Sequence, residues 1–332
     1  GRTIYYDRTT NFLAPLNVDS TLADSLASDF DVATAGEAEE LIAFARGLDV
    51  DDLDGDRDTN DAREWLFGDA LHSRPLPINY GSYGSYTDPS NSAIYLAVAT
   101  NDGMLRMIRN TNPSGSESGE EVWAFMPRNA MKAQKTLRAN GSGMKHPYTV
   151  DGAPVALLQD RNFDGSIVAN DGDKVYLYVG MRRGGKAYYA LDITNPEKPR
   201  LMWTIEKSGD FAELGYTFSN PRVGLINSAN GPRAVVMFAG GYDMNKDTRG
   251  VVGTDDSEGN AIYIIDAETG ELIWKARGGN GGSATVFEHP KLVDSIPSTL
   301  AAADTDGDGL TDRIVVGDTG GNVWRADIQG PD

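Results

Sequence analysis

Nine residues near the end of the sequence carry its strongest chemical signal. Oxygen donors stand at relative positions 1, 3, 5, 7 and 9, with a glycine at position 6; the donors are Asp304, Asp306, Asp308, the backbone carbonyl of Leu310, and Asp312. Four carboxylates so close together repel one another unless a cation lies between them. An all-oxygen set suits the flexible coordination of Ca²⁺ better than the rigid octahedron of Mg²⁺. The stretch therefore predicts a calcium site.

The setting of this stretch is that of a β-hairpin. Position 12 is Val315, where an EF-hand loop carries glutamate, and the residues on either side have the composition of strands. We therefore expect a calcium loop between two strands and not an EF-hand.

Two other stretches follow the same spacing less completely. In one, Asp160, Asn162 and Asp164 occupy positions 1, 3 and 5, but position 9 is apolar, which leaves Asp171 and Asp173 further along as substitute ligands. The other comprises Asp52, Asp54, Asp56, Asp58 and Asn60. Because an acidic solvated loop has the same composition, both stretches are candidate metal sites of lower rank. The corresponding segment 227–231 has no acidic residue and is expected to bind no metal.

Signals for enzymatic catalysis are poor. The three histidines, His72, His146 and His289, are far apart in the sequence, and structural or solvent-facing roles are expected for them. The absence of cysteine excludes thiolate zinc sites, iron–sulfur clusters and cysteine nucleophiles. The chain has no Gly-x-Ser-x-Gly elbow, phosphate-binding loop or dinucleotide fingerprint. We expect a protein that is not an enzyme and has no catalytic residues.

Net charge and hydropathy argue against nucleic-acid binding and against a membrane-spanning helix. The formal net charge is −19, and so acidic a surface repels the phosphate backbone of nucleic acids. No apolar run approaches the roughly 18 residues that a membrane-spanning helix needs. We expect neither a nucleic-acid partner nor a membrane span.

The elements that position the acidic stretches form a repeat. Segments rich in Tyr, Ile and Val end in Asp and lead through a turn to a Leu-x-Trp strand, as in 185–192 with 201–203 and 259–266 with 272–274. The segment 102–109 follows the pattern up to Trp123, and 321–327 repeats its first half. Each unit also contains two earlier strand-like stretches. Four strands per unit predict an all-β fold, a modified β-propeller with about four visible blades that belong to a larger ring.

The aromatic residues of the repeat are expected to pack between neighbouring blades. They include Trp123, Trp203, Tyr189 and Tyr263. In the turn 266–270, Asp266 is suited to cap backbone amides two residues ahead, and Gly270 is suited to a positive φ.

The first residues of the chain have a different pattern. Thr34 and Glu37 have the spacing of a capping box, and Gly47 follows a run of apolar residues, so a helix is predicted between them. A weaker helical pattern covers 20–28. We therefore divide the chain into a partly helical lead-in with an acidic Asp-rich loop at 1–71 and propeller blades at 72–332.

Eight short sequence motifs, or phrases, follow one another in a fixed order. Through them the chain resembles the C-terminal propeller domain of type IV pilus biogenesis proteins of the PilC/PilY class, which are pilus-tip-associated adhesins. The phrases are residues 68–75, 100–105, 122–127, 148–152, 188–192, 214–221, 304–312 and 317–325. The first repeat unit differs from the others at one position, because Arg109 stands where the other units have Asp. Residues 46–49 read Arg-Gly-Leu-Asp, so integrin recognition through Arg-Gly-Asp is not implied.

The resemblance implies a calcium-binding module that acts in fimbrium biogenesis, twitching motility and cell adhesion. Calcium in the Asp304 loop would regulate pilus extension against retraction and surface attachment. The implied partners are pilins, minor pilins and ligands on host or abiotic surfaces. The implied location is the bacterial cell surface, at the pilus tip or associated with the outer membrane.

Two other functions share part of the pattern. A ligand-binding propeller of the integrin α type has similar calcium loops in its hairpins but lacks the phrases given above. A quinone-dependent dehydrogenase also combines Leu-x-Trp repeats with calcium, but such enzymes commonly use an adjacent cysteine pair, which this chain does not have.

Overall fold

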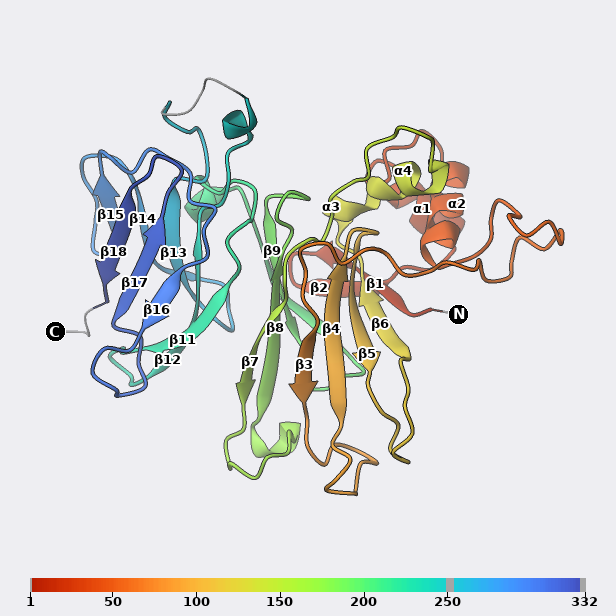
Figure 1. Cartoon of the computed structure of the whole chain (residues 1–332), viewed down its shortest axis with the longest axis horizontal. Coiled ribbons are helices and arrows are strands. Elements are labelled where there is room, and N and C mark those ends of the chain that lie inside the picture. The colour runs from red at the N-terminus through yellow and green to blue at the C-terminus, as the bar shows by residue number, and fades with distance from the viewer. Residues whose placement is uncertain (1, 249–253, 329–332) are drawn as a thin grey trace. The chain divides into compact units, whose positions relative to one another are not determined.

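The computed structural model describes residues 2–248 and 254–328, and within these residues the chain consists mainly of antiparallel β-sheets (Figure 1). It divides into two compact units. The first comprises Gly1–Ala153, Gln159–Lys174 and Ile193–Arg200, and the second comprises Pro154–Leu158, Val175–Asp192 and Leu201–Asp332.

The first unit is built on a six-stranded sheet with the order β2-β1-β6-β5-β4-β3. Its strands are β1 (Ile4–Thr9), β2 (Phe12–Pro15), β3 (Leu76–Asn79), β4 (Ile94–Thr100), β5 (Met104–Arg109) and β6 (Glu121–Phe125). The four strands from β3 to β6 form the expected blade. The hairpin β1–β2 extends it, because β1 pairs in parallel with β6 through Ile4 and Tyr5.

Helices of the first unit lie together near one end of this sheet (Figure 1). They are α1 (Ser20–Leu26), α2 (Ala35–Ala45), α3 (Arg128–Met131) and α4 (Ala133–Ala139). The predicted capping box is present in α2, where Thr34 Oγ1 accepts from the Glu37 amide at 3.2 Å and the Glu37 carboxylate accepts from the Thr34 amide at 3.0 Å. Gly47, with φ of +89°, follows this helix. Both helices predicted from the sequence are confirmed.

The second unit contains three sheets. Their orders are β10-β9-β8-β7, β11-β12-β13-β14-β15 and β16-β17-β18. The strands are β7 (Val155–Gln159), β8 (Lys174–Gly180), β9 (Ala187–Asp192), β10 (Arg200–Glu206), β11 (Arg222–Ile226), β12 (Arg233–Ala239), β13 (Ala261–Asp266), β14 (Leu272–Gly278), β15 (Val286–His289), β16 (Ala301–Ala303), β17 (Arg313–Gly317) and β18 (Val323–Asp327). Short 3₁₀ turns of this unit cover Gly209–Phe211 and Met244–Asp247, and a third, Ala169–Asp171, belongs to the first unit.

Tryptophans at the ends of the repeats fill the space beside the next turn. The Trp203 indole donates to the carbonyl of Ala267 at 3.3 Å, and the Trp123 indole donates to the carbonyl of Pro196 at 2.7 Å. In the turn after β13, Asp266 Oδ1 accepts from the amides of Glu268 and Thr269 at 2.9 and 2.8 Å. These side chains are packed as the repeat predicts.

The fold class expected from the sequence, an all-β modified propeller with a partly helical lead-in, is confirmed. The second sheet has the expected four strands, and the last sheet has three within the described residues. The lead-in also contributes the strands β1 and β2, which sequence patterning did not indicate. No helix in residues 2–248 and 254–328 combines the length and apolar character needed to cross a bilayer.

Candidate metal centres

The Asp304 loop joins two paired strands of the last sheet. Antiparallel pairing of β16 with β17 ends at Ala303 and Arg313, and the Asp312 amide closes the hairpin by donating to the Ala303 carbonyl at 2.9 Å. The neighbouring Thr311 amide donates to the Leu225 carbonyl on β11 at 2.7 Å. Because backbone hydrogen bonds hold its last residues, the loop has a defined base.

Within this loop, carboxylates organise the backbone. Asp304 accepts from the amides of Gly307 at 2.7 Å and Gly309 at 2.8 Å, and Asp308 accepts from the Leu310 amide at 2.7 Å. Both glycines have positive φ, +85° and +87°. These turns bring oxygens of Asp304, Asp306 and Asp308 within 4.8 Å of one another.

Asp312 stands apart from this group of three. Its Oδ2 accepts from both the amide and the hydroxyl of Thr305, at 2.6 and 2.7 Å. These hydrogen bonds lower the pKa of Asp312, and the amides of Gly309 and Gly307 lower the pKa of Asp304. Both carboxyls therefore stay ionised at neutral pH, which is the form that binds a metal cation.

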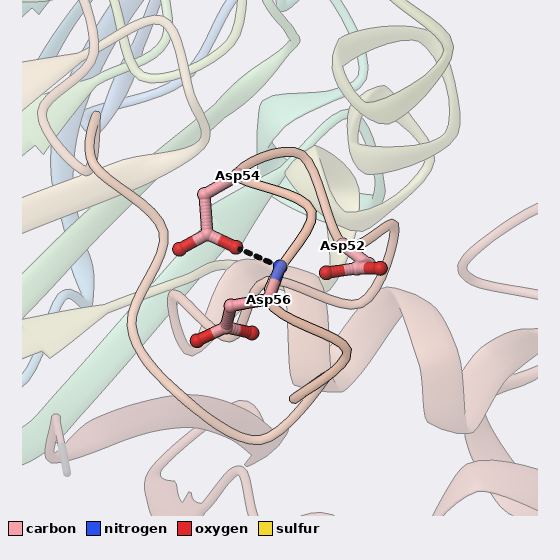
Figure 2. A group of neighbouring side chains, drawn as sticks. All are labelled: Asp52, Asp54 and Asp56. Carbon is pink, nitrogen blue, oxygen red and sulfur yellow. Dashed lines mark hydrogen bonds between the residues drawn. The ribbon is translucent and has the colours of Figure 1, made fainter.

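The Asp52 loop, in the first unit, has the same design. Oxygens of Asp52, Asp54 and Asp56 lie within 4.8 Å of one another, and Figure 2 shows their carboxylates around one turn of the chain. Asp52 accepts from the Arg57 amide at 2.9 Å and Asp54 from the Asp56 amide at 3.1 Å. The two remaining candidates continue the turn, since Asp58 accepts from the Asn60 amide at 2.9 Å.

The Asp160 loop follows the same backbone pattern with fewer acids. Asp160 accepts from the Gly165 amide at 2.8 Å, and Asn162 accepts from the Asp164 amide at 3.1 Å. Asp173 is engaged by the amides of Arg161 and Val168 at 2.8 and 2.9 Å, so its oxygens brace the loop. Among the described residues, this loop supplies no group of three clustered acids.

All three loops therefore share one local geometry. The first carboxylate accepts an amide five residues ahead, as in Asp52–Arg57, Asp160–Gly165 and Asp304–Gly309. These bonds hold an open turn with carboxylate oxygens around it. Such a hard-oxygen set suits Ca²⁺.

Sequence reasoning did not foresee two polar networks in the first unit. In one, Asn101 donates to Asp69 at 2.8 Å and to Asp151 at 3.1 Å, which links two histidines through their acid partners. His72 Nδ1 lies 2.6 Å from Asp151, and His146 Nε2 lies 3.3 Å from Asp69. The ordered phrases 68–75, 100–105 and 148–152 contain Asp69, His72, Asn101 and Asp151 and were the sequence signal for this cluster, whereas His146 lies outside them.

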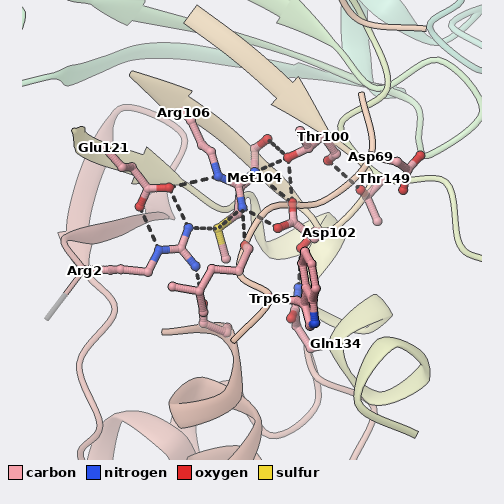
Figure 3. Close-up of polar contacts among 12 residues, drawn as sticks. Arg2, Trp65, Asp69, Thr100, Asp102, Met104, Arg106, Glu121, Gln134 and Thr149 are labelled. Atoms are coloured by element: carbon pink, nitrogen blue, oxygen red, sulfur yellow. Dashed lines mark hydrogen bonds and ion pairs between the residues drawn. The ribbon is translucent and has the colours of Figure 1, made fainter. Parts of the chain in front are cut away.

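The other network is a buried chain of ion pairs (Figure 3). The Arg106 guanidinium, with 1% of its side chain exposed, contacts Asp102 and lies 2.9 Å from Glu121. Glu121 in turn pairs with Arg2 at 2.7 Å. This network could not be predicted from a local sequence motif, because its members come from three separate segments.

Repeated antiparallel sheets with acidic hairpin loops define a propeller-class protein. The model of the PilY1 beta-propeller domain matches residues 73–331. The chain belongs to this family of type IV pilus biogenesis factors, as the ordered phrases indicated.

Curated relatives extend the match beyond the propeller. The type IV pilus biogenesis factor PilY1 of Pseudomonas aeruginosa is 29% identical over an alignment that covers 97% of this chain and 26% of the relative. A PilY1 homolog of Xylella fastidiosa is 28% identical and is matched over 76% of this chain and 15% of the relative. The chain thus spans about a quarter or less of the length of these relatives.

Among solved structures, the C-terminal domain of Pseudomonas aeruginosa PilY1 matches with 29% identity and a TM-score of 0.46. The match covers 71% of this chain and 38% of that domain's chain.

Proposed function

We propose that this chain is a calcium-responsive, non-enzymatic module of a type IV pilus biogenesis and adhesion protein. The observation that carries the proposal is the clustering of Asp304, Asp306 and Asp308 on an anchored hairpin. Calcium would be bound by these three aspartates, with Asp312 and the Leu310 carbonyl completing the set.

Binding would convert a repulsive loop into a rigid one. Without a cation, the three clustered carboxylates repel one another and favour a wider loop; with calcium, their charge is neutralised and one hairpin shape is stabilised. The Asp52 loop would be a second site of the same chemistry, and the Asp160 loop a weaker third.

The biological consequence follows from the family. Calcium occupancy would regulate the balance of pilus extension and retraction, with pilins and minor pilins as partners, and would influence attachment to host or abiotic surfaces. The module would act outside the cell, at the bacterial surface or pilus tip.

Calorimetry tests the site directly. Asp308→Ala should abolish tight calcium binding at the hairpin while the circular dichroism spectrum stays unchanged, because the aspartate is exposed and braces only the loop. Glu271→Gln, another exposed acid in the second unit, is the matched control and should bind calcium as the parent does. An unchanged isotherm for Asp308→Ala would refute the site.

A cellular test addresses regulation. In bacteria that make this chain, Asp308→Ala should change the amount of surface pili and the spread of twitching colonies, whereas Glu271→Gln should not. Calcium binding lost in vitro together with unchanged piliation and twitching would refute the regulatory role while leaving the metal site intact.

A further inference from the structure

The first unit contains a large groove that shares Asp54 with the Asp52 loop but whose other lining residues the calcium proposal does not use. Its volume is about 1100 Å³, and its walls come from three segments, 44–68, 102–104 and 134–140. This volume lies slightly above the usual range of small-molecule pockets, about 300 to 1,000 Å³, so the groove has room for several residues of an extended peptide.

At the floor of the groove, the charge of Asp102 is neutralised by an ion pair with Arg106. Asp102 and Met104 lie there together with Gln134, whose side chain donates to the Asp102 carbonyl at 2.6 Å (Figure 3). Burial disfavours the charged form of Asp102, yet the Arg106 guanidinium outweighs burial and holds the pKa of this carboxyl below its usual range. The negative charge of Asp102 is therefore neutralised by Arg106.

The rim is apolar and exposed. Leu53, Trp65 and Phe67 line the groove and have 78%, 80% and 59% of their surface accessible. Exposed apolar groups gathered at one concave site mark an interaction surface. Tryptophan is among the residue types most enriched in the few side chains that dominate the binding energy of protein interfaces.

The remaining charge on the walls is negative. The lining includes the acids Asp49, Asp51, Asp54 and Glu64 and the bases Arg63 and Arg138. Of the acids, Asp54 and Glu64 are exposed, whereas Asp49 is buried and accepts from the Leu53 amide at 2.8 Å. Arg138 is already paired with Asp51 at 2.8 Å and with Glu40 at 2.6 Å. The Arg63 guanidinium lies 3.7 Å from the centre of the Phe44 ring. The wall charges therefore favour a cationic occupant.

We propose that this groove binds a segment of a partner protein that presents a lysine or arginine next to an apolar side chain. The cationic group would lie against the Trp65 ring and near Glu64, and the apolar neighbour would cover Phe67 and Leu53. Cation–π contact with an exposed tryptophan and attraction to an acidic wall both act on such a segment. A second copy of this chain is a poor occupant because both copies carry a net charge of −19.

Selection from a random peptide library displayed on phage tests the proposal. The library is selected on the parent protein and counter-selected on Trp65→Ala, both at one fixed calcium concentration. Enriched peptides should carry Lys or Arg beside a large apolar residue. A synthetic copy of the best peptide should bind Trp65→Ala about tenfold or more weakly, as at an interface hot spot. It should bind Glu64→Gln a few-fold more weakly, with the difference shrinking as salt rises.

Matched controls separate the groove from the rest of the surface. Phe163, 90% exposed in another loop of the same unit, gives Phe163→Ala, and exposed Glu117 gives Glu117→Gln; both should bind the peptide as the parent does. Calcium binding should be unchanged in Trp65→Ala and Glu64→Gln, since neither is a candidate ligand. Failure of the groove and failure of the calcium site are thereby distinguishable.

Other outcomes would overturn the proposal. Selected peptides that are acidic or uncharged would contradict the charge argument, and a selection that yields no Trp65-dependent peptide would contradict the docking role. Binding of neutral glycans on an array, lost in Trp65→Ala while no basic peptide binds, would assign the groove to carbohydrate instead.

Discussion

At the scale of single residues, the turn after β13 depends on Gly270. Its φ is +74°, and a Cβ at this position would lie 2.7 Å from Cγ of Trp203. Gly270→Ala should therefore destabilise the chain by about 2 to 4 kcal/mol, from backbone strain together with displacement of the indole. Urea unfolding followed by tryptophan fluorescence measures this loss.

Gly231 supplies the control for Gly270. It also has a positive φ, +93°, but a Cβ there meets nothing within 4 Å. Gly231→Ala should show only the strain, about 1 kcal/mol. Equal losses for the two variants would mean that the contact with Trp203 contributes nothing.

The buried Asp102 carboxyl gives a pH-dependent contribution to stability. Its pKa is lowered in the folded chain because Arg106 outweighs the opposing effect of burial. A lowered folded pKa stabilises above the unfolded pKa of about 4, and this contribution is lost as the pH falls through the lower folded value. Asp102→Asn should cost about 2 to 3 kcal/mol at pH 7.

The pH profile distinguishes this effect from a simple packing loss. The difference in unfolding free energy between the parent and Asp102→Asn should shrink as the pH falls below about 4. Asp24→Asn, an exposed acid on α1, should show little difference at any pH. A constant gap for Asp102→Asn across the whole range would disprove the electrostatic explanation.

At the scale of elements, local signals were sufficient for α1, α2 and the blade strands, whereas α3 and α4 were not predicted. Helix α2 could be predicted because Thr34, Glu37 and Gly47 act within a few residues of the sequence. The hairpin β1–β2 could not, because its place in the sheet depends on parallel pairing of Ile4 with Ala124, more than a hundred residues away. Short strands take their partners from tertiary structure, which a sequence pattern does not contain.

The β1–β2 hairpin shares its core with the helices. Ile4, 1% exposed, belongs to one buried cluster with Leu41 and Ile42 of α2 and Met104 of β5. Ile4→Ala should therefore cost about 3 kcal/mol, as for deletion of a fully buried aliphatic side chain. Hydrogen exchange should show that the amides of β1 and α2 lose protection together.

Arg8 serves as the control on the same strand. Its side chain is exposed, so Arg8→Ala should change the unfolding free energy by less than about 0.5 kcal/mol. A loss for Ile4→Ala that is no larger than this would show that the lead-in does not contribute to the core of the first unit.

At the scale of the whole molecule, the sequence predicted the acidic loops but not the groove. The spacing of Asp304, Asp306 and Asp308 is local, and their clustering follows from turns within one loop. Trp65, Asp102 and Gln134 come together only because the strands and helices fold around one cavity. Chemistry within a loop is therefore visible in the sequence, whereas a site assembled from distant segments is not.

The proposed calcium sites lie in two acidic loops of separate units, and bound calcium should stabilise the chain at these loops. At about a hundred times its dissociation constant, a ligand stabilises the folded state by about 2.7 kcal/mol per site. Hydrogen exchange followed by mass spectrometry, in calcium and in chelator, should therefore show added protection in 52–60 and 304–312. Segment 227–231, which has no acidic residue, should exchange equally in both.

Substitution of one aspartate in each loop tests whether each protected segment binds a separate calcium ion. Asp308→Ala should abolish the calcium effect in 304–312 and leave that in 52–60 intact, and Asp54→Ala should do the reverse, because the loops belong to different compact units. Magnesium should protect both segments less, since it demands a stricter octahedral geometry. Protection that calcium spreads evenly over the chain, or that survives both substitutions, would mean that the ion acts by screening the charge of −19 and not by occupying these loops.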